Sequence, residues 1–253
     1  MRGSGVPAES PDTLPPDMSI AASEFKPETQ AALKRQGLDD PNDVLADNTG
    51  KKAESLAQTV LKHEGLPDGC RGVQPLRDVI PGHYDNKGSG IDLIGVTADG
   101  RPIPIEVKKR AGDQDSMGQD TVPLGSMEPE TLALKEDILR ERALRGESER
   151  HLASGESDRD LSTDQMAGLW TRDRWIKLIK DDERRAGLAQ AGISDDFLNL
   201  DNLKVADSPQ WRAFLDGRMI VVVSGDKDDV TDELFREAVF ERGCNVVVIN
   251  LKT

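Results

Sequence analysis

Long apolar runs are missing from this chain of 253 residues. No window approaches the roughly 18 consecutive apolar residues of a membrane-spanning helix, and the first residues contain no apolar segment of the kind found in secretory signals. The sequence therefore predicts neither a membrane span nor a signal peptide. With 36% hydrophobic and 32% charged residues, the composition is that of a soluble globular protein with polar insertions.

Cysteine and histidine are equally scarce. Cys70 and Cys244 are the only cysteines, and their wide separation fits neither a disulfide framework nor a zinc motif, so we expect two free thiols. The three histidines have no second His or Cys at ligand spacing: they are His63, His83 and His151. The sequence thus predicts no zinc site.

Positive charge is in deficit, with a formal net charge of −14. This balance argues against a protein that coats nucleic acid, because phosphate binding favours Lys and Arg. The acidic residues are unevenly distributed. Residues 51–110 contain 10 basic and 8 acidic side chains, whereas residues 111–165 contain 6 basic and 14 acidic ones. A net basic segment therefore lies next to a strongly acidic one.

The sequence divides the chain at about residue 48 into a linker and a folded domain. Residues 1–48 are acidic and rich in proline, so we expect a flexible linker with a short helix at 28–36. Residues 49–253 are expected to form the folded domain. Its first element is a helix over 51–64, where apolar residues recur every three or four positions before Gly65, and a strand is predicted at 72–79.

The second half of the chain predicts an insertion followed by a βαβ unit. Residues 111–163 are polar and acidic, with one helical stretch near 129–146, and we interpret them as a largely helical or loop insertion. A helix with a buried stripe is predicted in residues 165–185. Strands at 219–225 and 245–251 flank a predicted helix at 231–243, which is typical of a βαβ unit that closes a mixed sheet. The predicted fold class is α/β.

Residues 91–96 and 101–108 predict a β-hairpin around the sequence TADG. Apolar side chains of its second strand recur at alternate positions and must face the core: Ile103, Ile105 and Val107. Glu106 and Lys108 therefore share the opposite face. A three- or five-residue loop would place Asp92 opposite Glu106 and on the same face, whereas a four-residue loop would place it opposite Ile105.

Two carboxylates that converge on one point are costly unless a cation lies between them. Ligands that offer only oxygen suit a hard ion, Mg²⁺ or Mn²⁺. A lysine beside such an ion can orient or deprotonate a water molecule and offset the charge that develops on a phosphate. Asp92, Glu106 and Lys108 together are therefore typical of phosphodiester hydrolysis.

The order of these residues resembles the PD-(D/E)xK nuclease superfamily, whose core is αβββαβ. Asp92 matches the first carboxylate of the motif, Glu106-Val107-Lys108 matches E-x-K, and Glu54 matches a glutamate on the preceding helix. Gly90-Ile91 stands where the motif has proline before the aspartate. The resemblance implies a restriction-endonuclease-like fold.

The resemblance also implies a site in which Mg²⁺ or Mn²⁺ is held by Asp92, Glu106, Glu54 and the carbonyl of Val107. Lys108 would act with Asp92 and Glu106 in catalysis.

The sequence GIDLIG…DGRPIPIEVK, followed by Gln165-Met166 and Trp170, is similar to nuclease toxin domains at the C-termini of contact-dependent inhibition and other polymorphic bacterial toxins. This resemblance implies delivery as part of a larger toxin, action in the cytoplasm of a target cell, and a cognate immunity protein as partner. Residues 1–48 would then be the remnant that joins the toxin to its delivery protein. The implied substrate is DNA or tRNA, with DNA slightly favoured.

Other candidate residues have simpler interpretations beside the functional one. Gln165 would pack or cap a helix, or stand beside the metal. Lys109 would be a solvated strand end, or hold a phosphate. Glu64 could replace Glu54 as the helical ligand, but its place at the helix end favours Glu54. The tryptophans of the 165–185 helix are expected to pack in the core rather than stack on bases.

Two other functions compete with the nuclease. An acidic protein could be a binding module, such as an immunity or inhibitor protein that mimics nucleic acid with its surface. Such an inhibitor has no need to keep Asp92, Glu106 and Lys108 on one face. A degenerate nuclease fold used only for assembly is the third alternative, and an intact motif argues against it.

Overall fold

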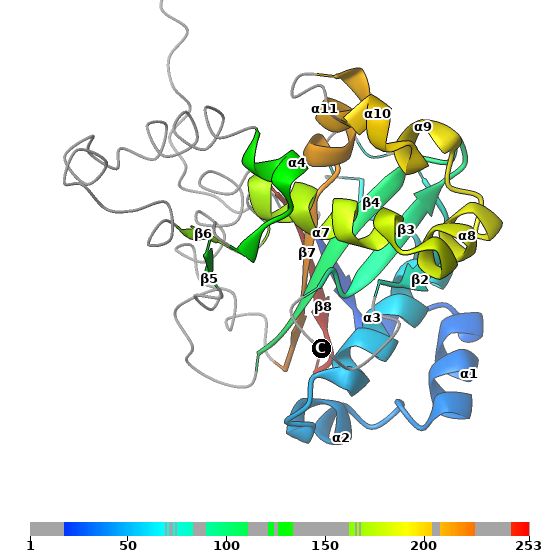
Figure 1. Ribbon diagram of the computed structural model, residues 1–253. Coiled ribbons are helices and arrows are strands. Elements are labelled where there is room, and N and C mark those ends of the chain that lie inside the picture. Colours follow the sequence, from blue (N-terminus) through cyan, green and yellow to red (C-terminus); the bar gives the residue numbers. More distant parts are fainter. Residues whose placement is uncertain are drawn as a thin grey trace, which may run out of the picture.

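The computed structural model describes residues 18–68, 70, 73, 75–82, 90–110, 121–123, 126–133, 162–164, 166, 168–203, 208–225 and 244–252. Its centre is a six-stranded sheet in the order β1-β8-β7-β4-β3-β2 (Figure 1). These strands are β1 (Ser19–Ala21), β2 (Leu76–Pro81), β3 (Leu93–Thr97), β4 (Pro102–Arg110), β7 (Met219–Ser224) and β8 (Asn245–Asn250). A separate pair joins β5 (Thr121–Pro123) to β6 (Ser162–Asp164).

The sheet is mixed. β2, β3 and β4 run antiparallel to one another, whereas β4, β7, β8 and β1 pair in parallel. The predicted α/β class with a mixed sheet is therefore confirmed. The strand predicted at 72–79 lies at 76–81 instead.

One face of the sheet is covered by the N-terminal helices, η1 (Ala22–Glu24), α1 (Pro27–Gln36), α2 (Pro41–Ala46) and α3 (Lys51–Glu64). The predicted helix at 51–64 is confirmed, and its buried residues recur every three or four positions, as a helix packed on one side requires: Ala53, Leu56, Ala57, Val60 and Leu61. They join Ile103 and Ile105 of β4 in one apolar cluster. The odd-numbered residues of β4 thus face α3.

Within the described residues, the helices that cover the other face are α7 (Gly168–Lys180), α8 (Asp182–Gln190), α9 (Asp195–Leu198), α10 (Leu200–Leu203) and α11 (Pro209–Asp216). Ile94 and Val96 of β3 pack in this second cluster, together with Trp170 and Trp175. Both tryptophans are fully buried, so the prediction that they pack in the core is confirmed. The even-numbered residues of β3, and by alternation those of β4, face this layer.

The central strands β7 and β8 consist almost entirely of apolar residues because both faces of the sheet are covered there. Their parallel register pairs Val221 with Val247. The two strands of the predicted βαβ unit are confirmed, while the helix predicted at 231–243 lies outside the described residues.

Residues 18–48 differ from the predicted linker. β1 adds a parallel edge strand through pairs such as Ser19 with Val248, and α1 and α2 pack on α3. Leu33 and Val44 are buried in the cluster beneath α3. This segment is part of the folded unit, so position 48 is not a structural boundary.

Within the predicted insertion at 111–163, the structure describes β5, residues 126–133 and the first two residues of β6. Residues 126–133 contain α4 (Pro129–Leu132), and Met127 is buried in the cluster that holds Trp170. This part of the insertion is docked on the domain. In the described part of the chain, no helix is long and apolar enough to cross a membrane.

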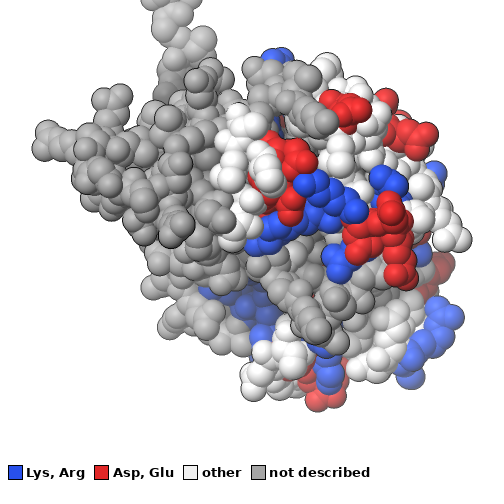
Figure 2. All heavy atoms as spheres, in the orientation of Figure 1, with Lys and Arg blue, Asp and Glu red and all other residues white. Residues whose placement is uncertain are grey.

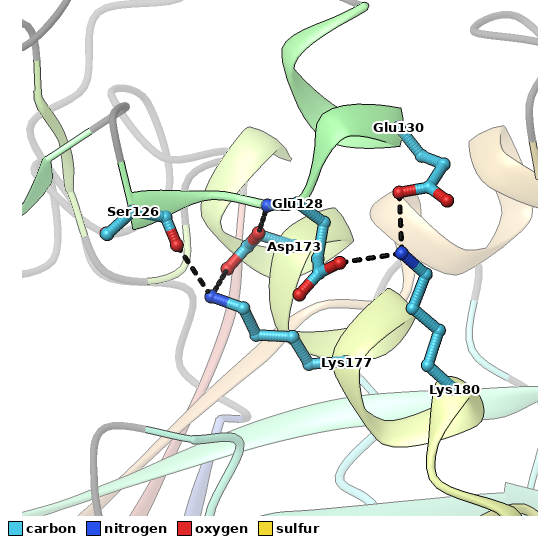
Figure 3. A network of polar contacts seen from close by, with 6 residues as sticks. All are labelled: Ser126, Glu128, Glu130, Asp173, Lys177 and Lys180. Atoms are coloured by element: carbon cyan, nitrogen blue, oxygen red, sulfur yellow. Dashed lines mark hydrogen bonds and ion pairs between the residues drawn. The ribbon is translucent and has the colours of Figure 1, made fainter.

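The docking of residues 126–133 depends on one buried carboxylate of α7 (Figure 3). Asp173, fully buried, accepts a hydrogen bond of 2.8 Å from the backbone N–H of Glu128 and pairs with Lys177 at 2.8 Å. Lys177 also donates to the carbonyl of Ser126. Lys180 contacts the carboxylates of Glu128 and Glu130 at 2.6 and 2.7 Å, and these contacts raise the pKa of its ammonium group. Backbone and side chains together fasten the segment to α7.

We predict that Asp173→Ala destabilises the protein by roughly 2–3 kcal/mol, because it removes a charged acceptor from a buried N–H and a buried partner from Lys177. Residues near 126–133 should also become sensitive to protease. Denaturant unfolding and limited proteolysis measure both effects. Asp182→Ala is the matched control, since its carboxylate pairs with Arg185 on the surface and should contribute less than about 1 kcal/mol. Equal effects of the two substitutions would contradict this role for Asp173.

Candidate active site

The tip of the β3–β4 hairpin sets the register of the site. The N–H of Thr97 donates to the carbonyl of Arg101 at 3.0 Å, which leaves a three-residue loop of residues 98–100. Gly100 has φ +79°, the left-handed conformation that closes a loop of this length. Its carbonyl accepts from the N–H of Ser194, so the loop is also held by the turn before α9.

This register places Asp92 opposite Glu106. Leu93 pairs with Ile105 and Ile94 with Pro104, and one step further toward the strand end brings Asp92 level with Glu106. Directly opposed residues of an antiparallel pair point to the same face. The condition that the sequence left open, a three- or five-residue loop, is therefore met. Lys108 pairs with Glu106, and the Asp92 carboxylate lies close enough to Glu106 to raise its pKa.

A glycine secures the backbone on the other side of Asp92. The N–H of Gly82, just after β2, donates to the carbonyl of Asp92 at 2.9 Å. A Cβ atom at position 82 would lie 2.1 Å from the carbonyl oxygen of Ile91, which no side chain can tolerate. Glycine at this position thus allows β2 to approach closely enough to hold Asp92 in place.

The carboxyl groups of Asp92 and Glu106 lie in different surroundings. Glu106 is 3% exposed, and its pKa is raised well above the usual value, first by burial and then by the negative charge of Asp92. Lys108 opposes this shift, with its Nζ 3.1 Å from Oε1 of Glu106. Asp92 is half-buried and accepts a hydrogen bond of 2.8 Å from the N–H of Val107. A cation between the two carboxylates would relieve their repulsion.

The carbonyl of Val107 points toward the same side as its N–H. In an extended strand, the N–H and C=O of one residue point to the same neighbouring strand. Because the N–H of Val107 meets the carboxylate of Asp92, the carbonyl lies on the Asp92 side of β4. The predicted oxygen ligands Asp92, Glu106 and Val107 are therefore neighbours, and an all-oxygen set of this kind fits Mg²⁺ or Mn²⁺.

Glu54 is placed differently. It lies in the first turn of α3, and α3 covers the face of β4 opposite to Glu106. Among the described residues, no three His, Cys, Asp or Glu side chains gather as a metal-ligand group. The structure therefore does not bring Glu54 together with Asp92 and Glu106, contrary to the predicted convergence, because its helix packs on the opposite face of β4.

The alternative helical ligand, Glu64, has a structural task. Its Oε1 accepts hydrogen bonds from the backbone N–H of Lys26, at 2.7 Å, and from the hydroxyl of Thr29. Lys26 and Thr29 flank the start of α1, so Glu64 satisfies the amino end of that helix. Sequence reasoning missed this contact because it joins residues 38 positions apart.

Lys109 points away from the carboxylate pair, to the α3 face, and its Nζ donates to the carbonyls of Leu45 and Asp47. It is therefore neither a solvated strand end nor a neighbour of the carboxylates. Gln165 lies outside the described residues. Neither Cys70 nor Cys244 takes part in a disulfide, as expected.

Comparison of the chain with protein-family models, with curated proteins and with solved structures found no match. The case for a function therefore rests on the residues and their geometry.

Glu106 should make stability fall as pH rises. The pKa of Glu106 is higher in the folded than in the unfolded state, so its protonated carboxyl contributes to the stability of the fold. This contribution is fully present below the unfolded pKa and is lost as pH rises through the folded pKa. Without divalent cations, Glu106→Gln should therefore be more stable than the wild type at pH 8, with the difference vanishing near pH 4. Denaturant unfolding at both pH values measures this. If Glu106→Gln were instead less stable than the wild type at pH 8, the negative charge of ionised Glu106 would already be offset by its neighbours.

Proposed function

We propose that this protein is a metal-dependent endonuclease of the PD-(D/E)xK type. The observation that carries the proposal is the placement of Asp92, Glu106 and Lys108 on one face, where β3 begins beside β4. The order of elements supports it. α3, β2, β3, β4, α7 and β7 occur in the order αβββαβ, and β7 is parallel to β4. β5, α4 and β6 lie between β4 and α7, and α8 to α11 lie between α7 and β7.

Each residue of the site has a role that its surroundings favour. Asp92, Glu106 and the carbonyl of Val107 would hold Mg²⁺ or Mn²⁺. The bound ion would supply Lewis-acid polarisation of a phosphate and of water. Lys108 is 19% exposed, so its ammonium group can reach both Glu106 and a ligand. It would orient the attacking water and offset negative charge on the phosphate.

The net charge of −14 weighs less against this proposal than the sequence suggested. The described residues include 20 Lys and Arg and 24 Asp and Glu, so most of the excess acid belongs to the rest of the chain. Figure 2 shows Lys and Arg interspersed with Asp and Glu on the described surface of one face. The described part of this face is therefore not the continuous acidic surface that a mimic of nucleic acid needs.

The assay that tests the proposal incubates the purified protein and Mg²⁺ with plasmid DNA and, separately, with total tRNA. We expect cleavage of one substrate, with DNA slightly favoured, and its loss in EDTA. Glu106→Gln and Lys108→Ala should each reduce the rate on the order of a hundredfold or more, since each removes a group that stabilises the transition state.

Two control variants keep the fold and change the same residue types elsewhere. Glu183→Gln alters an exposed carboxylate of α8, and Lys62→Ala removes a surface ion pair with Asp78. Both should cleave at the wild-type rate. Cleavage that survives in Glu106→Gln would rule out this site. An absence of cleavage together with binding to a nuclease would favour the inhibitor.

The biological role that the resemblance implies is part of the proposal. The domain would act as a toxin delivered by a larger protein into the cytoplasm of a competing bacterium, with a cognate immunity protein as its partner. Expression inside bacterial cells should then arrest growth, and Glu106→Gln at the same protein level should not. Growth arrest by both proteins would show that toxicity does not come from this site.

A further inference from the structure

Three polar side chains lie in a row at the carboxyl ends of the parallel strands. Arg110 ends β4 and pairs in register with Ser224 of β7, which in turn pairs with Asn250 of β8. All three are buried, with exposed fractions of 3%, 0% and 4%. Residues in register on neighbouring parallel strands point to the same face, so the three side chains follow one another across the sheet.

This row lies on the same face as the candidate site. Glu106 is in register with Ile220, whose side chain packs in the apolar cluster between the sheet and α7. Because side chains alternate along β4, Lys108 and Arg110 project to the same face as Glu106. Two residues of an extended strand span about 6.6 Å, so Arg110 lies that far beyond Lys108. This step is comparable to the separation of neighbouring phosphates along a nucleic-acid strand.

The chemistry of the row fits a phosphate. The guanidinium group of Arg110 is always charged, and its fixed fork of donors matches phosphate oxygens. Ser224 adds a hydroxyl group. Oδ1 of Asn250 accepts from the N–H of Lys252 at 3.2 Å, so the NH₂ group is the remaining donor of that amide. The row therefore combines one buried positive charge with neutral donors.

The place of the row in the sheet also favours a ligand. β4 pairs antiparallel with β3 and parallel with β7, so the direction of pairing changes at this strand. In open α/β sheets, ligands bind beyond the carboxyl ends of the strands where the topology switches. A guanidinium group is costly to bury, and a charge retained at such a strand end is typical of a binding site.

We propose that Arg110 and Ser224 bind a second phosphate of the substrate, next to the phosphate that reacts at Glu106 and Lys108. This inference rests on the proposed nuclease function. It specifies the substrate as a polynucleotide that continues past Lys108 toward the carboxyl ends of β4 and β7. Arg110 then holds the strand in register, while Lys108 acts on the neighbouring phosphate. Asn250, one strand further from Arg110, flanks the subsite.

Binding of a labelled single-stranded oligonucleotide in EDTA tests this subsite without catalysis. The DNA and the RNA version of one short sequence are each titrated at several salt concentrations, and fluorescence anisotropy gives the binding constant. Arg110→Gln should weaken binding on the order of tenfold, the usual effect of losing a charged hydrogen bond. The slope of the logarithm of the binding constant against that of the salt concentration should become shallower by about 0.7, the share of one phosphate contact.

Two further arginine variants separate the contact from an effect on the fold. Arg185→Gln is the matched control, because it removes a charge from the surface of α8, where Arg185 pairs with Asp182 at 2.6 Å. It should keep the wild-type affinity and slope. Arg110→Lys keeps a positive charge but loses the fork of donors, so it should keep the slope and recover only part of the affinity. A wild-type slope in folded Arg110→Gln would overturn the inference.

A change in the oligonucleotide tests the same contact even if Arg110→Gln does not fold. Single phosphates are replaced in turn by uncharged methylphosphonates. In the wild type, binding should fall on the order of tenfold at one position. Ser224→Ala should weaken binding of the unmodified strand and cause little further loss for the strand modified at that position. Equal losses at every position, or additive losses with Ser224→Ala, would contradict the subsite.

The outcomes also separate this inference from the proposed function. Binding through Arg110 without cleavage in Mg²⁺ would remove the nuclease function and leave a phosphate-binding site. Cleavage that depends on Glu106, together with wild-type binding in Arg110→Gln, would remove the inference alone. A wild-type protein that binds neither oligonucleotide would overturn the inference directly.

Discussion

The three-residue loop between β3 and β4 is the constraint on which the candidate site depends. Because side chains alternate along a strand, one residue more or less in that loop would move Asp92 to the α3 face and separate it from Glu106. The left-handed Gly100 and the hydrogen bond from Ser194 keep the loop at this length and place. A turn at one end of the hairpin thus decides which groups meet at the other end.

Two buried carboxylates show how differently the same group can be used. Asp173 receives a backbone N–H and a lysine, and its charge fastens residues 126–133 to α7. Glu106 is almost as deeply buried, yet it faces a second carboxylate, and Lys108 does not prevent the rise of its pKa. Native proteins tolerate such local conflicts chiefly where function requires them. This contrast is the physical reason to seek chemistry at Glu106 rather than at Asp173.

The elements that the sequence predicted well are those in which local pattern and burial agree. The hairpin alternates strictly, α3 repeats every three or four residues, and β7 and β8 are apolar throughout because both faces are covered. The pairing of Asp92 with Glu106 could only be stated as a condition, a three- or five-residue loop, because the sequence did not exclude a four-residue loop around TADG.

What could not be predicted depends on contacts between distant residues. Residues 18–48 have the composition of a linker, yet Glu64 binds the start of α1 and Lys109 binds the end of α2, so the domain itself supplies the partners that order them. The same holds for residues 126–133, which are held largely through backbone groups that no side-chain pattern reveals. In both cases a charged side chain of a well-predicted element satisfies the backbone of a poorly predicted one. Charged residues at the ends of α3, β4 and α7 therefore do more than solvate the surface: they determine which polar segments become part of the fold.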